Sequence, residues 1–355
     1  MSPLRIVHIP GRTPYARKLR GDDIYIVNGT TSGEFAVPED VTLAWLMDRW
    51  PWDWFDVVHL HHIDFEPVPL LRAALAACRR AGKRVVFTAH DLSPVFGDRT
   101  THHRRLRILA EHDVPFACLT SAAEADIHQR LPVRTIVAPH GYVAQPGTPQ
   151  RQILRESGPT RFLMYGSLRS NRDVELVLAC WRFARDLRES TMHLLLRAPS
   201  RRSLAEDAAV WEAIRAHTAD PRLRVDVLPF PSDDDVNGAV AQSDCLLLPY
   251  RWASHSGQLE HAFDLGVLPV AARTGYLPYQ AESHDGLVSE PEWFSWPAGE
   301  PFGHGARLLA AMQAAHGLIQ NGWCAPHRER FAHHRQNEHT EILAAYRTLY
   351  GGTER

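Results

Sequence analysis

The sequence lacks a charge excess of either sign. Its 355 residues include 39 lysines and arginines against 41 aspartates and glutamates, which gives a formal net charge of −2. Proteins that gather nucleic acid or an anionic membrane at their surface carry a basic excess. The near balance therefore predicts that nucleic acid is not a partner.

Cysteine and long apolar runs are also scarce. The five cysteines are scattered and form no CxxC pair, so neither a zinc nor a redox centre is indicated, and they are typical of reduced thiols in a cytoplasmic protein. No apolar run approaches the ~18 residues of a spanning helix, and the N-terminal MSPLRIVHIPGR has only a short one. We expect no signal peptide and no integral membrane segment. Lysine occurs only at Lys18 and Lys83, and this preference for arginine is typical of a GC-rich genome. We expect a bacterial, cytoplasmic protein.

The remaining composition is that of a globular protein. Hydrophobic residues make up 45% of the chain and charged residues 23%, which excludes a disordered or fibrous chain. At ~100 to 200 residues per domain, the length favours two domains.

Short apolar runs recur with helical patterns between them, as the strands of a parallel sheet buried on both faces require. In the first half these runs are Leu4–Ile9, Ile24–Val27, Val57–Leu60, Arg84–Thr88, Phe116–Thr120 and Thr135–Val137.

A break in this alternation separates two halves. The stretch 143–160 is rich in proline and glycine and predicts an interdomain linker. Strand-like runs then resume at Arg161–Tyr165, His193–Leu196, Val225–Leu228, Cys245–Leu248, Leu268–Ala272 and Gly286–Val288. We predict an N-terminal Rossmann-like domain over 1–145, a C-terminal one over 146–335, and a final helix over 336–355 that returns toward the first domain. Two facing, doubly wound domains would bind ligands in the cleft between them.

The strongest local signal is the stretch Cys245–Ala272. A buried strand is followed by a loop, and a short helix begins near Ser256 and Gly257. A small residue and a glycine at a helix start let backbone N–H groups approach a phosphate, and the helix dipole favours its charge. Glu260, about one turn further, could reach a ribose or sugar hydroxyl, although an ordinary capped helix with a solvated glutamate explains the same residues.

Two further strand ends carry polar residues. Gly166 follows the strand Arg161–Tyr165, and Arg172 stands where the next helix starts, so its guanidinium could bridge two phosphoryl groups. A solvated arginine is the simpler alternative. His90 comes directly after the strand Arg84–Thr88, a place suited to binding or catalysis, although most single histidines are structural.

Taken together, these segments resemble the retaining GT-B glycosyltransferases, which move sugars from nucleoside diphosphate donors. The resemblance runs from Ile6 to about Tyr350. It is carried by the segments 56–61 (DVVHLH), 86–91 (VFTAHD), 136–141 (IVAPHG), 166–172 and, above all, 244–257 with Glu260, Gly266 and Pro269.

The resemblance implies a role for each candidate residue. Arg172 stands where the family has a basic residue on the donor diphosphate, and Ser256 and Gly257 stand where backbone amides hold it. Glu260 matches the second carboxylate of a motif of two glutamates separated by seven residues, which binds the nucleotide ribose. His90 matches a histidine that contacts the donor sugar. Gly11 fits where the chain passes close to the donor phosphates, and Gly166 fits the glycine loop after the first strand of the second domain.

The resemblance also implies the reaction and its partners. We expect transfer with retention from a nucleotide-sugar donor to a sugar, natural-product or lipid-linked acceptor, with no metal or other cofactor. The acceptor would meet the loops Arg12–Tyr15, Asn28–Phe35 and His61–Phe65. Two positions depart from the family: Trp252 replaces the first motif glutamate, and Ser167 replaces a basic residue. They leave a variation in donor, or a binding protein without transfer, as alternatives.

Other functions have weaker support. A nicotinamide enzyme would need a Gly-x-Gly-x-x-Gly fingerprint after the first strand, where Pro10-Gly11-Arg12 stands instead. His59 and His61 alternate on one strand and could share a metal ion, but no third ligand is indicated. An aromatic cluster could form a membrane-facing patch, an acceptor wall or a packing cluster; its members are Trp45, Trp50, Trp52, Trp54 and Phe55.

Overall fold

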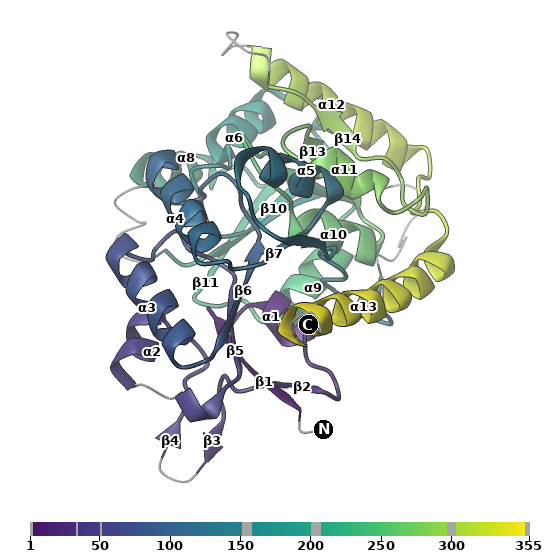
Figure 1. The fold of residues 1–355 in the computed structure, drawn as a ribbon. Helices are drawn as coiled ribbons and strands as arrows, with labels where there is room; N and C mark the ends of the chain where they lie inside the picture. The colour runs from purple at the N-terminus through teal and green to yellow at the C-terminus, as the bar shows by residue number, and fades with distance from the viewer. Residues whose placement is uncertain are drawn as a thin grey trace. The chain divides into compact units, whose positions relative to one another are not determined.

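The computed structural model describes residues 3–32, 35–49, 52–150, 158–199, 207–296 and 303–351. The chain divides into two compact units, of which unit 1 comprises Met1–Gly141 with Asn337–Arg355 and unit 2 comprises Tyr142–Gln336 (Figure 1). Part of the predicted linker, residues 151–157, lies outside the described residues. None of the helices within the described ranges has the length and apolar character needed to cross a bilayer.

Unit 1 contains a parallel sheet of six strands in the order β2-β1-β5-β6-β7-β8. A small antiparallel hairpin, β3 and β4, lies outside it. The strands are β1 (Leu4–Ile9), β2 (Ile24–Ile26), β3 (Thr31–Ser32), β4 (Phe35–Ala36), β5 (Val57–Leu60), β6 (Arg84–Ala89), β7 (Phe116–Cys118) and β8 (Thr135–Val137).

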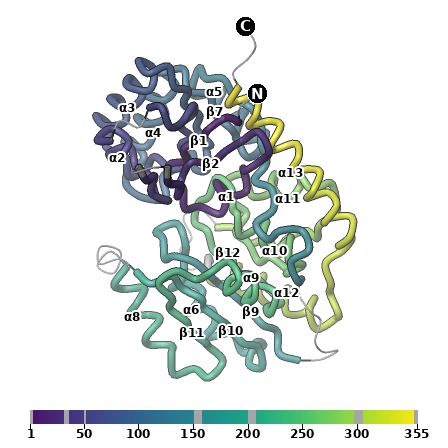
Figure 2. The backbone as a smooth tube through the Cα atoms, turned by 90° about the horizontal axis from the view of Figure 1, so that it is seen from below, coloured from purple at the N-terminus to yellow at the C-terminus, as the bar shows by residue number. Residues whose placement is uncertain are grey.

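The helices of unit 1 cover its sheet in part directly, as α3 does at β6 and α5 at β7 and β8, and in part through one another, since α2 and α4 contact α3. They are α1 (Pro14–Lys18), α2 (Leu43–Arg49), α3 (Val68–Arg80), α4 (Arg99–Glu111), α5 (Ser121–Arg130) and the C-terminal part of α13 (Arg328–Gly351), with a 3-10 turn η1 at Trp52–Trp54. Figure 2 traces α13 as the long yellow helix. Its residues Ile342, Tyr346 and Tyr350 are fully buried against strand residues such as Ile6 and Val57. The C-terminal part of α13 is thus a structural part of unit 1.

Unit 2 contains a second parallel sheet of six strands, in the order β11-β10-β9-β12-β13-β14. In chain order this is 3-2-1-4-5-6, the order of dinucleotide-binding sheets. The strands are β9 (Arg161–Gly166), β10 (Thr191–Arg197), β11 (Leu223–Leu228), β12 (Cys245–Leu248), β13 (Leu268–Ala272) and β14 (Glu292–Phe294). The helices are α6 (Val174–Phe183), α8 (Ala208–His217), α9 (Asp233–Ala241), α10 (Gly257–Leu265), α11 (Leu277–Glu282), α12 (Gly303–Gln320) and the start of α13, with a 3-10 turn η2 at Arg185–Leu187.

The predicted fold class is confirmed, since both sheets are parallel and most predicted strands lie within a few residues of the observed ones. One prediction was wrong: residues 286–288 form no strand, because Gly286 turns the chain with φ +70° after α11, and the sixth strand is β14. The final helix begins at Arg328, earlier than predicted. In the aromatic cluster, Phe55 is 1% exposed and its ring lies 5.8 Å from that of Trp52, which favours packing, while Trp50 lies outside the described residues.

Candidate functional site

In unit 2 the strand order reverses between β9 and β12, and parallel sheets of this kind bind ligands beyond the carboxyl ends of the strands at such a point. Gly166 ends β9 with φ +105°, a conformation that favours glycine. An isolated bridge then joins Arg172, just before α6, to Tyr250, just after β12. The sheet topology therefore brings two predicted site residues, Gly166 and Arg172, to one edge.

Arg172 is held in place by neutral groups. Its Nη1 donates to the backbone oxygen of Tyr165 at 2.8 Å, its Nη2 donates to the Tyr250 hydroxyl at 3.2 Å, and the guanidinium lies 5.3 Å from the centre of the Tyr250 ring. Its Nε is buried and has no hydrogen-bond partner among the described residues. No carboxylate of the described part of the chain forms an ion pair with Arg172, and the neighbouring Asp173 pairs with Arg251 instead, so these residues leave the positive charge of Arg172 without a counter-ion.

The start of α10 lies in the same polar network. Ser256 caps the helix, because its Oγ accepts from the amide of Leu259 at 3.2 Å, and it also lies 3.1 Å from the Tyr250 hydroxyl. The Ser256 amide donates to Gln280 Oε1 at 2.9 Å, so it is already engaged. Of the two amides predicted to hold a diphosphate, that of Gly257 remains at the open first turn of the helix.

Glu260 is joined to Ser256 through Gln280, and its carboxylate is held by buried donors. It is 2% exposed, and its carboxylate accepts from Gln280 Nε2 at 2.6 Å, from His284 Nε2 at 2.9 Å and from Arg335. Three donors on a buried carboxylate are sufficient to explain a glutamate at this position structurally. The ribose contact predicted for Glu260 stays a prediction, and the geometry gives the residue a role in anchoring α10.

The neighbouring His261 faces the carboxyl end of β9 instead, and the sequence reasoning missed it. Its Nδ1 lies 2.8 Å from the Tyr165 hydroxyl and its Nε2 lies 2.8 Å from Asn237 Oδ1. Burial lowers the pKa of His261 to about 4, so the ring is neutral at pH 7. Tyr250 and Gln258 were also missed, although Gln258 Nε2 donates to the Tyr165 oxygen at 2.8 Å. Their only signal in the sequence was their position next to a strand end or a helix start.

In unit 1 the strand order reverses between β1 and β5. Gly11 follows β1, and a Cβ on it would lie 2.2 Å from Asn28 Nδ2 and 2.2 Å from the backbone oxygen of Glu39. Asn28 Nδ2 in turn donates to the oxygens of His8 and Glu39. Packing within unit 1 therefore explains the glycine, and the phosphate contact predicted for Gly11 stays a prediction.

His90 lies directly after β6, as predicted, and is 6% exposed. Its Nε2 lies 3.2 Å from Nδ1 of His61, which follows β5, and its ring meets the Tyr15 ring edge-on at 4.7 Å. Asp64, a neighbour of His61 in the sequence, does not join them, because its carboxylate accepts from His102 Nδ1 at 2.7 Å. Of the loops predicted to meet an acceptor, residues 33 and 34 lie outside the described part of the chain.

No family model and no curated protein matches this chain in sequence. Its fold, in contrast, is similar to several solved structures. The sucrose-phosphate synthase of Thermosynechococcus elongatus superposes with a TM-score of 0.67 at 12% identity, over 99% of this chain and 100% of that one. HepE of Anabaena in complex with UDP-glucose gives 0.65 at 12% identity, over 97% and 100%. A glycosyltransferase of Rickettsia africae gives 0.61 at 11% identity, over 99% and 98%. The chain has the GT-B fold of these glycosyltransferases.

Proposed function

We propose that the protein is a glycosyltransferase that uses a nucleoside diphosphate sugar as its donor and binds the diphosphate at the β9–β12 edge of unit 2. The observation that carries this proposal is the network around Arg172, whose Nε is buried without a partner while its Nη groups are fixed by Tyr165 and Tyr250. HepE, which has the same fold, was solved with UDP-glucose bound. Uridine is therefore the first base to test.

The groups that we propose to bind the diphosphate would act by electrostatic stabilisation. When the bond between the sugar carbon and the diphosphate oxygen breaks, negative charge develops on the departing diphosphate. We propose that Arg172 and the Gly257 N–H at the start of α10 lie next to that charge, because groups fixed before the reaction stabilise it without reorganising. We propose that the acceptor is a hydroxyl of a sugar, natural product or lipid-linked glycan, and that transfer retains the anomeric configuration.

We also propose that transfer needs no metal ion, because Arg172 supplies the positive charge that a divalent cation would otherwise bring to a diphosphate. Turnover should then be unchanged in excess EDTA. A loss of turnover that Mg²⁺ or Mn²⁺ restores would contradict this part of the proposal.

The direct test is binding and turnover with a panel of nucleotides. Calorimetric titration with UDP, GDP, ADP and dTDP identifies the base, and proton NMR of the product formed from the matching sugar nucleotide reports its anomeric configuration. Arg172→Ala should weaken diphosphate binding or turnover by ~100-fold, or about 3 kcal/mol, as expected for one charged donor lost from a leaving group. Arg182→Ala, which removes the same charge from the exposed face of α6, is the control.

Substitution of His90 tests whether the protein is an enzyme or only binds the nucleotide. We propose that it orders the transferring sugar, so that His90→Ala leaves UDP affinity within a few-fold and lowers turnover by about 100-fold. Nucleotide binding without turnover of any donor in the wild-type protein would favour the binding-only alternative. Failure of every nucleotide to bind would refute the proposal.

A further inference from the structure

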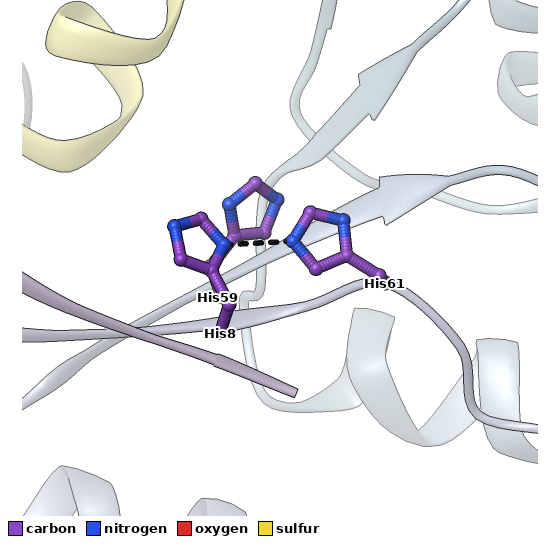
Figure 3. A group of neighbouring side chains, drawn as sticks. All are labelled: His8, His59 and His61. Carbon is purple, nitrogen blue, oxygen red and sulfur yellow. Dashed lines mark hydrogen bonds between the residues drawn. The ribbon is translucent and has the colours of Figure 1, made fainter. Parts of the chain in front are cut away.

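Three buried imidazoles lie together at the carboxyl ends of β1 and β5 (Figure 3). His8 and His59 are 0% exposed and His61 is 1% exposed, and one nitrogen of each lies within 4.8 Å of the others. The rings of His59 and His61 are 4.0 Å apart. Each neutral imidazole carries one N–H donor and one acceptor nitrogen, so a buried group of them must satisfy both kinds.

Three histidines form a possible ligand set for zinc, but the hydrogen bonds favour another arrangement. Both nitrogens of His59 are engaged, Nδ1 with the Tyr350 hydroxyl and Nε2 with the Thr88 hydroxyl, each at 2.7 Å. His8 Nδ1 lies 2.8 Å from His61 Nε2, so these two nitrogens share a hydrogen. A metal ion would have to break these bonds.

The contacts instead form a chain that ends on His90. It runs from His8 Nδ1 to His61 Nε2 at 2.8 Å, and from His61 Nδ1 to His90 Nε2 at 3.2 Å. Burial lowers the pKa of His8 to about 3 and that of His61 well below its usual value, so both rings are neutral at pH 7. Each of these two rings then carries one hydrogen, and its position decides which nitrogen donates.

The nitrogen at the His8 end of this chain of imidazoles determines which ring donates in each hydrogen bond. His8 Nε2 is buried and has no hydrogen-bond partner among the described residues. Because a buried N–H without an acceptor is rare and costly, the hydrogen of His8 belongs on Nδ1, from where it is donated to His61 Nε2. His61 must then carry its hydrogen on Nδ1 and donate it to His90 Nε2.

We propose that His8 and His61 form a directed imidazole chain that holds His90 as its Nδ1–H tautomer. His61 and His8 are positioning residues in this scheme. With its Nε2 engaged by the His61 N–H, the His90 ring has its own hydrogen on Nδ1 and no nitrogen left to act as a base. In the proposed transfer it would therefore act through this hydrogen rather than by removing a proton. This last statement rests on the proposed function, whereas the tautomer does not.

The tautomers are measured directly by two-bond ¹H–¹⁵N correlation NMR of protein labelled with ¹⁵N-histidine, with His8, His61 and His90 assigned from single variants. We expect all three rings to show the Nδ1–H pattern. In His61→Leu, which removes the donor, the His90 signal should shift toward a mixture of tautomers. In His61→Asn the side-chain amide can take the place of Nδ1–H, and the His90 pattern should return.

Kinetics give the second readout. His61→Leu should lower kcat by about 10-fold, a fraction of the ~100-fold expected for loss of His90 itself, with KM for the donor changed less than about twofold, and His61→Asn should recover most of kcat. His59→Asn is the matched control, because it removes a buried imidazole that touches His61 but lies outside the chain. It should lower thermal stability and leave the His90 signal unchanged.

An Nε2–H pattern on His8 or His90 in the wild-type protein would overturn the proposal. So would one equivalent of bound zinc or another transition metal, found by elemental analysis of the purified protein and lost in His59→Asn. If no sugar nucleotide is turned over, the proposed function fails. The NMR spectra still decide whether the directed imidazole chain exists.

Discussion

Arg335 provides the sharpest test of what holds α10 in place. This side chain of α13 is 2% exposed and meets two buried carboxylates, with its Nε donating to Asp264 Oδ1 at 2.8 Å and its Nη2 to Glu260. In Arg335→Met both carboxylates keep their other donors and lose their cation. Breaking a buried pair in this way costs about 3–5 kcal/mol, because uncompensated charge stays buried.

The loss should appear in the thermal unfolding of unit 2. For a unit of roughly this size, 1 kcal/mol corresponds to about 2–4 °C, so Arg335→Met should lower its Tm by about 6–20 °C in scanning calorimetry. The control is Arg130→Met, which removes an exposed pair with Asp126 on α5 and should cost less than about 1 kcal/mol. Adding Glu260→Gln and Asp264→Asn to Arg335→Met should recover much of the loss, since no buried charge would remain.

The pH dependence has a definite sign. Burial raises the pKa of Asp264, and the Arg335 guanidinium opposes that rise. A carboxyl group whose pKa is higher in the folded than in the unfolded state stabilises the fold at low pH and loses that contribution as pH rises. Without Arg335 the rise in pKa is larger, so the destabilisation by Arg335→Met should be smaller at pH 5 than at pH 8. A Tm loss under about 2 °C, or one that grows toward acid pH, would refute the reasoning.

Further predictions concern the two strand-order reversals. Gly11→Ala should cost about 1–3 kcal/mol of folding free energy in urea denaturation, because the new Cβ would meet Asn28, and a cost under about 0.5 kcal/mol would show that the loop moves freely. Gly82→Ala, at φ +65° with no atom within 4 Å of the new Cβ, should cost only the backbone strain of about 1 kcal/mol. Tyr250→Phe removes the hydroxyl that fixes Arg172 but keeps the ring, and should weaken UDP binding about 3- to 10-fold in calorimetry, whereas unchanged affinity would remove the hydroxyl from the site.

The fold could be predicted because buried parallel strands leave a strong signal. The run Cys245–Leu248 is apolar throughout and Val57–Leu60 is apolar except for His59, and the structure buries every residue in both. The segment 286–288 failed for the converse reason. Its apolar residues and glycine resemble a strand, but Gly286 adopts φ +70° and the chain pairs only later, at Glu292. A short strand at a sheet edge depends on its neighbour more than on its own sequence.

The candidate site was predictable only where backbone geometry decides it. Gly166 and Ser256 were found because a strand end and a helix cap have recognisable residues. The orientation of a side chain on a helix is a tertiary property, and a difference of one position turned Glu260 inward to Arg335 while His261 faced Tyr165. His8 was missed as a partner of His61 because its strand neighbours β5 only in the folded sheet.

The two units share one more feature, a contact between an arginine and an aspartate. It lies far from the loops at the carboxyl ends of the strands, and those loops can therefore change while the sheet stays the same. Arg5 of β1 binds Asp56 through its backbone amide at 2.9 Å, its Nε at 3.2 Å and its Nη2 at 3.0 Å. In unit 2, Arg161 of β9 binds Asp244 through the same three groups, at 2.9, 3.0 and 2.9 Å.

Each aspartate directly precedes the strand across the reversal, so both clamps lie at the amino ends of the strands that flank it. Because a one-residue slip would turn every side chain of a strand to the opposite face, a fixed register at the amino end also fixes which side chains emerge at the carboxyl end. The loops there can then change their residues without disturbing the sheet. The chain has the same fold as sucrose-phosphate synthase at only 12% identity, and it carries His61 and Arg172 in the segments that follow β5 and β9, and His261 on α10.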